Sequence, residues 1–335
     1  MANEHMESLY QTLMQAADLL HQQVKTSYLE AATEAGEDLT AGTINVQDGV
    51  PNQETVAKLT ALFKPVKITD FSAEEVRQAL QLILVKAIRL DAIEPNKQVT
   101  PDAMAELATF VATTFLPQPA ALTVFDPAAG TGNLLFAVMN QLKAALAVPV
   151  TGVGVDNDET LLAFAGMSSQ LQQLDVALYH QDALGPLAAT DVDLVVSDLP
   201  VGYYPLDERA KQFATAAKSG HSYAHHLMIE QSLRALKDGG LGLFFVPSTV
   251  FQSEEAAGLT AWLTSSAHFQ GLLNLPQSLF ANPAAQKSLL ILQKPGAHTK
   301  QAKQVLLGSF PELSDRKAFS EFIDSVRTWA AQNLA

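Results

Sequence analysis

The run Val124-Phe125-Asp126-Pro127-Ala128-Ala129-Gly130-Thr131-Gly132-Asn133-Leu134-Leu135 decides the fold of this chain. An apolar strand pattern ends in Asp126, a turn of small residues containing Gly130 and Gly132 follows, and a helical pattern begins at once. A helix that starts directly after such a turn points backbone N–H groups and the positive end of its dipole at one spot. Because glycine has no Cβ, a ligand can come close to the main chain there. The stretch therefore predicts a cradle for a cofactor.

The sequence around this cradle alternates between short apolar runs and helical periods. This pattern is typical of an α/β fold, in which a mostly parallel, doubly wound sheet is covered by helices on both faces. In such sheets ligands bind beyond the carboxyl ends of the strands, near the point where the strand order reverses. We predict seven strands, at 122–126, 150–155, 176–180, 192–197, 241–246, 269–274 and 288–293.

Acidic residues end the first four predicted strands or follow them closely. In chain order they are Asp126, Asp156, Asp182 and Asp198. A carboxylate at the second position can accept hydrogen bonds from both hydroxyls of a ribose, and Asp182 could accept one from the exocyclic amine of an adenine. A single aspartate after a strand is most often a turn or cap residue. Four of them at one sheet edge, beside a glycine turn, favour a ligand site.

The spacing of the glycines separates the candidate cofactors. A nicotinamide dinucleotide site would place a third Gly or an Ala where the chain has Leu135, and a phosphate-binding Walker loop would need Gly-Lys-Ser/Thr. A cofactor with an adenosine and a short zwitterionic tail fits better. The ammonium of that tail would lie near Asp126, and its carboxylate near the helix N-terminus. An NAD-linked oxidoreductase is the weaker alternative.

These residues resemble a known motif. Asp126-Pro-Ala-Ala-Gly-Thr-Gly-Asn133 is similar to the S-adenosylmethionine (SAM) motif of class I methyltransferases, in the form found in adenine-N6 DNA methyltransferases and in modification subunits of type I restriction systems. Val99-Thr100-Pro101-Asp102 resembles the family's segment before the first strand, and 238–248, 273–280 and 288–294 resemble its last three strands. With helical segments in front, the whole chain looks like the YtxK-like group of this family.

The resemblance implies SAM as the cofactor and assigns the residues that would hold it. The predicted cofactor-binding residues are Thr100, Asp126, Pro127, Ala128, Gly130, Gly132, Asn133, Leu134, Asp156, Asn157, Asp182 and Ala183.

The family's catalytic tetrapeptide, Asn/Asp/Ser-Pro-Pro-Tyr/Phe, corresponds to Asp198-Leu199-Pro200-Val201. In the family the first side chain and the next carbonyl accept hydrogen bonds from the target amine, so Asp198, Leu199 and Pro200 are the predicted catalytic residues. The aromatic residue is missing at the fourth position. Tyr203 and Tyr204 are the predicted substrate-contacting replacements.

Residues 1–95 are predicted to form a small helical domain, and residues 96–335 the methyltransferase domain. The patterns predict helices over 3–35, 56–63 and 73–90, a short hairpin within 36–52 and a linker at 94–97. Ser72 and Glu75 have the spacing of a capping box at the start of the third helix. No catalytic group of residues is visible in this part.

The composition of the chain limits its cysteine chemistry, its location in the cell and its partners. The chain of 335 residues has no cysteine, which excludes disulfides and thiolate metal sites. The N-terminus lacks the pattern of a signal peptide, and no apolar run is long enough to span a membrane, so a cytoplasmic protein is expected. The net charge of −14 counts against a nucleic-acid partner, because phosphate contacts supply much of the affinity of such proteins.

The sequence thus predicts a SAM-dependent methyltransferase that acts on a nitrogen, with adenine N6 in DNA or another nucleic acid as the candidate acceptor. The altered tetrapeptide motivates a second hypothesis, a SAM-binding regulatory or interaction module without catalysis. Methyl transfer needs no metal, and none is predicted; His221, His225 and His226 are interpreted as solvent-exposed or loop-packing residues. The acceptor, the oligomeric state and the role of residues 1–95 stay open.

Overall fold

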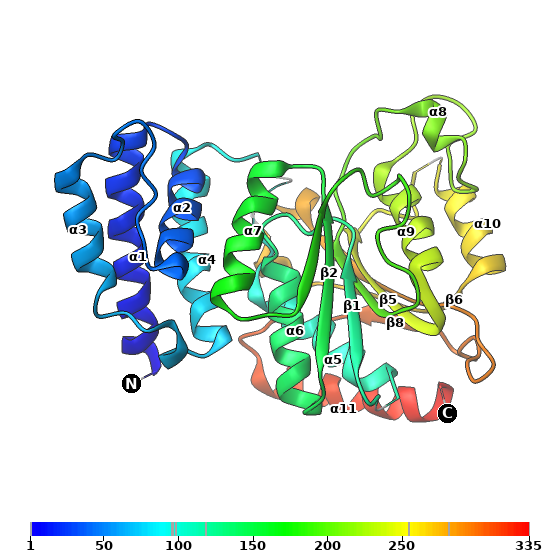
Figure 1. The fold of residues 1–335 in the computed structure, drawn as a ribbon. Coiled ribbons are helices and arrows are strands. Elements are labelled where there is room, and N and C mark those ends of the chain that lie inside the picture. Colours follow the sequence, from blue (N-terminus) through cyan, green and yellow to red (C-terminus); the bar gives the residue numbers. More distant parts are fainter. Residues whose placement is uncertain are drawn as a thin grey trace.

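The computed structural model places a group of helices beside an α/β part (Figure 1). The structure describes residues 2–94, 97, 99–117, 119–253, 255–280 and 282–334, without the side chains of the first two of these. Two residues of the predicted linker, Pro95 and Asn96, lie outside the described residues. The predicted division of the chain at residue 95 stays a prediction.

One mixed sheet forms the centre of the α/β part, with the strand order β3-β2-β1-β4-β5-β7-β6-β8. Neighbouring strands from β3 to β5 are parallel, whereas β7 is antiparallel to both β5 and β6. The strand order reverses between β1 and β4, which is where a ligand site is expected in such a sheet. The strands are β1 (Leu122–Asp126), β2 (Val150–Asp156), β3 (Val176–His180), β4 (Val192–Asp198), β5 (Leu236–Pro247), β6 (His268–Asn274), β7 (Lys287–Gln293) and β8 (Leu306–Ser309).

All seven predicted strands form, and β8 is an eighth strand that the sequence analysis did not predict. β8 has only four residues, pairs in parallel with β6 alone and lies at the edge of the sheet. Its side chains are largely outside the core, with Leu307 67% exposed. A strand this short, and without a buried face, lacks the apolar alternation by which strands are recognised.

Helices cover both faces of the sheet (Figure 1). α5 (Asp102–Phe115), α6 (Asn133–Leu146) and α11 (Arg316–Asn333) pack over one face, and α9 (Ala224–Ala235) and α10 (Ala256–Ser266) over the other. The fully buried Phe136 of α6 and Phe244 of β5 belong to these two separate apolar cores. α7 (Glu159–Leu171) follows β2, and the short α8 (Asp207–Ala210) lies in the loop after β4.

The N-terminal part contains α1 (Ala2–Val24), α2 (Tyr28–Ala41), α3 (Gln53–Phe63), the 3₁₀ turn η1 (Ile68–Asp70) and α4 (Ala73–Leu90). The prediction of one helix over 3–35 was wrong, because Lys25 adopts a left-handed φ of 61° that ends α1. Ser27 and Glu30 then form a capping box that starts α2. α2 continues to residue 41, so of the predicted hairpin only an isolated bridge between Gln47 and Val50 is present.

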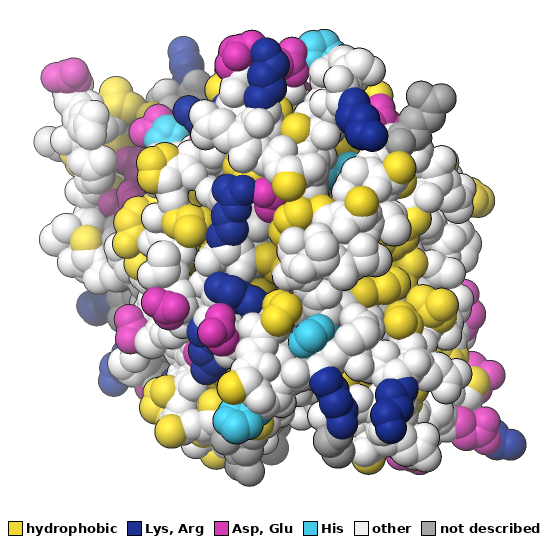
Figure 2. All heavy atoms as spheres, turned by 90° about the vertical axis from the view of Figure 1, so that its right-hand side faces the viewer, with side chains coloured by type: hydrophobic (Ala, Val, Ile, Leu, Met, Phe, Trp, Pro, Cys, Tyr) yellow, Lys and Arg dark blue, Asp and Glu magenta, His cyan; other side chains and the backbone are white. Residues whose placement is uncertain are grey.

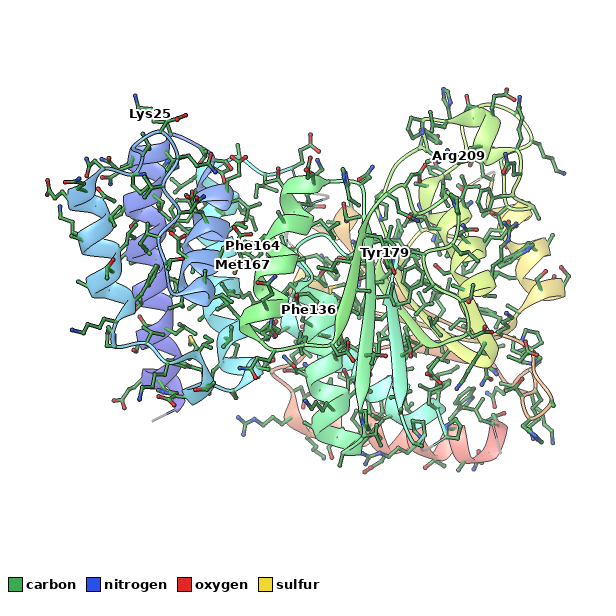
Figure 3. All side chains as sticks on the ribbon, viewed as in Figure 1. Lys25, Phe136, Phe164, Met167, Tyr179 and Arg209 are labelled. Carbon is green, nitrogen blue, oxygen red and sulfur yellow. The ribbon has the colours of Figure 1, made fainter. Side chains whose placement is uncertain are left out.

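The helical part packs directly on the α/β part through α2 and α7. Phe164 and Met167 of α7 are both about 1% exposed, belong to the core of the N-terminal helices, and point toward them in Figure 3. Gly36 of α2 permits the close approach, since a Cβ at this position would lie 2.2 Å from the sulfur of Met167. The core of the helical part is therefore completed by a helix that follows β2.

Candidate cofactor and acceptor site

A cavity of about 760 Å³ opens where the strand order reverses, and it collects most of the predicted site residues. Two are not among its lining residues: Gly132, which forms the N-cap of α6, and Leu199, whose side chain is fully buried. The predicted residues that line the cavity are Thr100, Asp126, Pro127, Ala128, Gly130, Asn133, Leu134, Asp156, Asn157, Asp182, Ala183, Asp198, Pro200, Tyr203 and Tyr204.

The glycine turn is fixed to the sheet by its own backbone. The Ala129 N–H donates to the Val155 carbonyl of β2 at 2.9 Å, and the Gly132 N–H donates to the Ala129 carbonyl at 2.8 Å. Gly132 has a φ of 77°, and a Cβ there would lie 2.4 Å from the Phe136 ring. Both the left-handed backbone and the buried ring thus require glycine where α6 begins.

Asp126 is a buried carboxylate whose hydrogen-bond donors are neutral. It is 1% exposed, and its Oδ1 accepts from the Ser197 hydroxyl at 2.7 Å and from the Ala128 N–H at 3.0 Å. Burial, helped by the nearby carboxylates of Asp156 and Asp198, raises the pKa of Asp126 to about 7 although these two hydrogen bonds lower it. A cationic group of a ligand would supply the missing counter-charge, so the ammonium of SAM fits this position.

Asp156, at the end of β2, joins the glycine turn to the start of α7. Its Oδ2 accepts from the Gly130 N–H at 2.7 Å, and its Oδ1 from the Asp158 N–H at 2.9 Å. Burial raises the pKa of Asp156, although these backbone hydrogen bonds act in the opposite direction. Each carboxylate oxygen keeps a second lone pair, so the predicted bonds to ribose hydroxyls are compatible with this geometry.

Asp182 is held by two side chains from the loop after β4. Its Oδ2 accepts from the Tyr204 hydroxyl at 2.5 Å and forms an ion pair with Arg209, which Figure 3 places at α8. Burial and the Asp182 carboxylate together raise the pKa of Tyr204 to about 12, so the hydroxyl stays a donor. Tyr204 is 7% exposed, and its ring therefore has little free surface for a ligand.

Asp198 also has a partner that the sequence analysis missed. Its Oδ2 accepts from the Thr100 hydroxyl at 3.1 Å, and its Oδ1 forms an ion pair with Lys287. Lys287 is the first residue of β7 and pairs with Pro247 at the end of β5. An antiparallel strand brings its start to the edge where the parallel strands end. A lysine at the beginning of such a strand is the signal that could have revealed this partner.

Tyr203 presents the most exposed aromatic ring of the loop after β4. The ring is 55% exposed and stacks on Tyr223 with centroids 4.6 Å apart. Tyr223 in turn contacts His225 and His226 of α9, which are buried and pack against this loop residue, whereas His221 is exposed. Each of the three histidines thus fits one of the two alternatives expected for them. Burial lowers the pKa of His225 to about 3 and of His226 to about 4, which keeps both imidazoles neutral.

Three basic side chains near the cavity are paired with acids. Lys97 contacts Asp158, and Arg209 and Lys287 pair with acids of the cavity. Figure 2 shows the face on the α8–α10 side, where Lys and Arg side chains stand in separate small groups between apolar ones, without one continuous basic band. Within the described residues, no three His, Asp or Glu side chains come together as a metal site would require, and no helix is long and apolar enough to cross a membrane.

The sheet order and the place of the cavity define the class of the fold, that of class I methyltransferases. Residues 7–88 match the YtxK N-terminal helical domain, and residues 93–320 match the N-6 DNA methylase family. The chain therefore belongs to the N-6 DNA methylase family, with a YtxK-like helical domain in front. The resemblance inferred from the glycine turn is confirmed.

Individual relatives agree with this assignment. YtxK of Bacillus subtilis (strain 168), a protein of uncharacterized function, is 38% identical over 329 residues, which is 98% of each chain. A solved structure from Listeria monocytogenes, provisionally assigned as a class I SAM-dependent methyltransferase, is 36% identical with a TM-score of 0.91 and covers 98% of this chain and 99% of its own. The methyltransferase subunit of a type I restriction-modification system from Streptococcus thermophilus, at 16% identity and a TM-score of 0.65 over 90% of this chain and 71% of its own, shares the fold.

Proposed function

We propose that the protein is a SAM-dependent methyltransferase that acts on an amino nitrogen, with adenine in a nucleic acid as the first candidate acceptor. The observation that carries the proposal is the buried Asp126 carboxylate, which has neutral donors and lies beside a glycine turn at the reversal of the strand order. The membership in the N-6 DNA methylase family supports the nitrogen acceptor.

Each group of residues has a separate task in this proposal. Asp126 would hold the ammonium of SAM, Asp156 its ribose, and the Gly130–Gly132 turn would leave room for its tail. SAM supplies a methyl group on a positively charged sulfur. Asp198 and the Leu199 carbonyl would accept hydrogen bonds from the acceptor amine and so direct its lone pair at the methyl carbon. In the transfer the nitrogen–carbon bond would form as the carbon–sulfur bond breaks, the sulfur would leave as a neutral thioether, and the nitrogen would then pass its proton to water.

The acceptor would meet the exposed Tyr203 ring at the mouth of the cavity. Tyr203 already stacks on Tyr223, and this pair offers a flat apolar surface of the kind on which bases stack. Tyr204 is bonded to Asp182 and would stabilise the adenosine side of the cavity instead. We therefore assign Tyr203 to the acceptor and Tyr204 to the support of the cofactor pocket.

A second function is favoured by the ion pair between Asp198 and Lys287. Lys287 occupies one oxygen of the carboxylate that would receive the acceptor amine. A SAM-binding module that no longer transfers methyl groups would tolerate this arrangement permanently, whereas an enzyme must release the lysine when the acceptor binds.

Two measurements on the full chain separate these functions. Calorimetric titration with SAM and with NAD tests which cofactor the protein binds. Binding of SAM is expected, and binding of NAD without binding of SAM would contradict the proposal. Incubation with methyl-labelled SAM and separate DNA, RNA and protein fractions then tests transfer. Label in the nucleic-acid fraction that disappears in Asp198→Ala supports the enzyme, while SAM binding without label in any fraction supports the module.

A further inference from the structure

Arg77 of α4 is a buried cation that reaches from the helical part to the cofactor cavity. It is 2% exposed and forms ion pairs with Glu74 of its own helix and Asp102 at the start of α5. Its Nη1 also donates to the Asn133 Oδ1 at 3.0 Å. Asn133 is the first residue of α6 and lines the cavity. A residue of the helical part thus contacts the cofactor motif directly.

The contact continues to the acceptor end of the cavity. The Asn133 amide nitrogen donates to the Thr100 carbonyl at 3.0 Å, and the Thr100 hydroxyl donates to the Asp198 carboxylate at 3.1 Å. The series Arg77–Asn133–Thr100–Asp198 therefore consists of three consecutive hydrogen bonds. All its members except Arg77 line the cavity.

The chemistry of arginine gives this series a direction. A guanidinium group can only donate, so the Asn133 oxygen must face Arg77, and the amide nitrogen must then face the Thr100 carbonyl. Without Arg77 the side-chain amide of Asn133 could flip and exchange the positions of its oxygen and nitrogen. The hydrogen bond from its nitrogen to the Thr100 carbonyl would then be lost. Glu74 and Asp102 hold the guanidinium in place, and their hydrogen bonds raise its pKa although burial lowers it.

We infer that Arg77 is a positioning residue, through which the helical part fixes Asn133 and Thr100 and so sets the affinity of the cavity for SAM. This inference rests on the proposed function, since it concerns SAM binding, and it gives the N-terminal helices a role in the site. It makes the docking of α4 a requirement for a fully formed cofactor pocket.

The test is a double-mutant cycle with SAM affinity as the readout. Arg77→Met and Asn133→Ala are each expected to weaken SAM binding about tenfold, the effect of about one hydrogen bond to a charged group. If Arg77 acts through Asn133, the double variant binds no more weakly than Asn133→Ala alone. The matched control is Gln81→Met, because Gln81 lies on the same helix and donates to Asp102 at 2.8 Å. This control is expected to lower the unfolding temperature and leave SAM affinity unchanged.

The outcomes are distinguishable. If the losses of SAM affinity in Arg77→Met and Asn133→Ala multiply in the double variant, Arg77 does not act through Asn133 and the inference is overturned. Equal losses of SAM affinity in Arg77→Met and Gln81→Met would also overturn it, because they would show that Arg77 only joins the two parts. If Arg77→Met fails to fold, Arg77→Lys replaces it in the same cycle, since it keeps a charge beside Glu74 and Asp102. If the unmodified protein binds no SAM, the proposed function fails and the inference fails with it.

Discussion

Replacing Asp126 by asparagine tests whether the buried carboxylate awaits a cationic ligand. In the folded protein its pKa is about 7, against an ordinary value of 3.8. Between these values the folded state holds the proton and the unfolded chain has lost it, so stability falls as pH rises. Above pH 7 both states are ionised, and the full cost of a pKa raised by about three units, about 4 kcal/mol, is present.

The expected change in the free energy of unfolding can be calculated for a pH range that is practical for experiments. From pH 5 to pH 8 this group should remove about 3 kcal/mol from the free energy of unfolding of the unmodified protein, whereas Asp126→Asn has no such group to titrate. Urea unfolding of both proteins at pH 5 and pH 8, at constant ionic strength, measures the change in their difference. Other titrating groups are common to both proteins and cancel.

A control and a ligand arm complete this experiment. Ser197→Ala removes a donor that lowers the pKa of Asp126, so the pH-dependent loss should extend to higher pH in this variant. SAM affinity should rise from pH 5.5 to pH 7 in the unmodified protein and stay flat in Asp126→Asn, because the carboxylate binds the ammonium only when ionised. A stability difference that does not change with pH would refute the assignment of a raised pKa.

Three further variants test other parts of the site. Asp156→Ala should weaken SAM binding by about 1–3 kcal/mol in calorimetry, through the lost ribose contacts; unchanged affinity would remove Asp156 from the cofactor site. Gly132→Ala should lower the free energy of unfolding by at least about 1 kcal/mol in urea, because its φ of 77° and the Phe136 ring both exclude a Cβ; a neutral effect would show that the turn adapts. Lys287→Met should leave SAM affinity within about twofold and change methyl transfer, because Lys287 pairs with the carboxylate that would receive the acceptor amine; unchanged transfer would separate Lys287 from the acceptor step.

The strands and the place of the cavity could be predicted, because both depend on local patterns. Each of the seven predicted strands is an apolar run followed by turn residues, and the acids at their ends come together because parallel strands end at one edge. The break between α1 and α2 was also present in the sequence, as Ser27 with Glu30 three residues later, and was missed.

The partners of the acids were not predicted, because they depend on how distant segments pack rather than on local patterns. Lys287 is far from Asp198 in the chain and reaches it only through the antiparallel pairing of β7 with β5. Arg77 and Arg209 likewise find their partners through helix packing and the course of a loop. The raised pKa of Asp126 depends on the burial of its side chain. The apolar pattern predicts burial for the strand as a whole, but not for the polar residue at the end of the strand.

The shared packing of α2 and α7 has a consequence for how the chain unfolds. The N-terminal helices have no closed core of their own, since Phe164 and Met167 complete it. Separating the chain near residue 95 would leave these two side chains facing water, at a cost of about 1.5–3 kcal/mol each. The helices and the sheet should therefore melt in one cooperative transition, and a shortened protein that begins after them should aggregate through the bare face of α7.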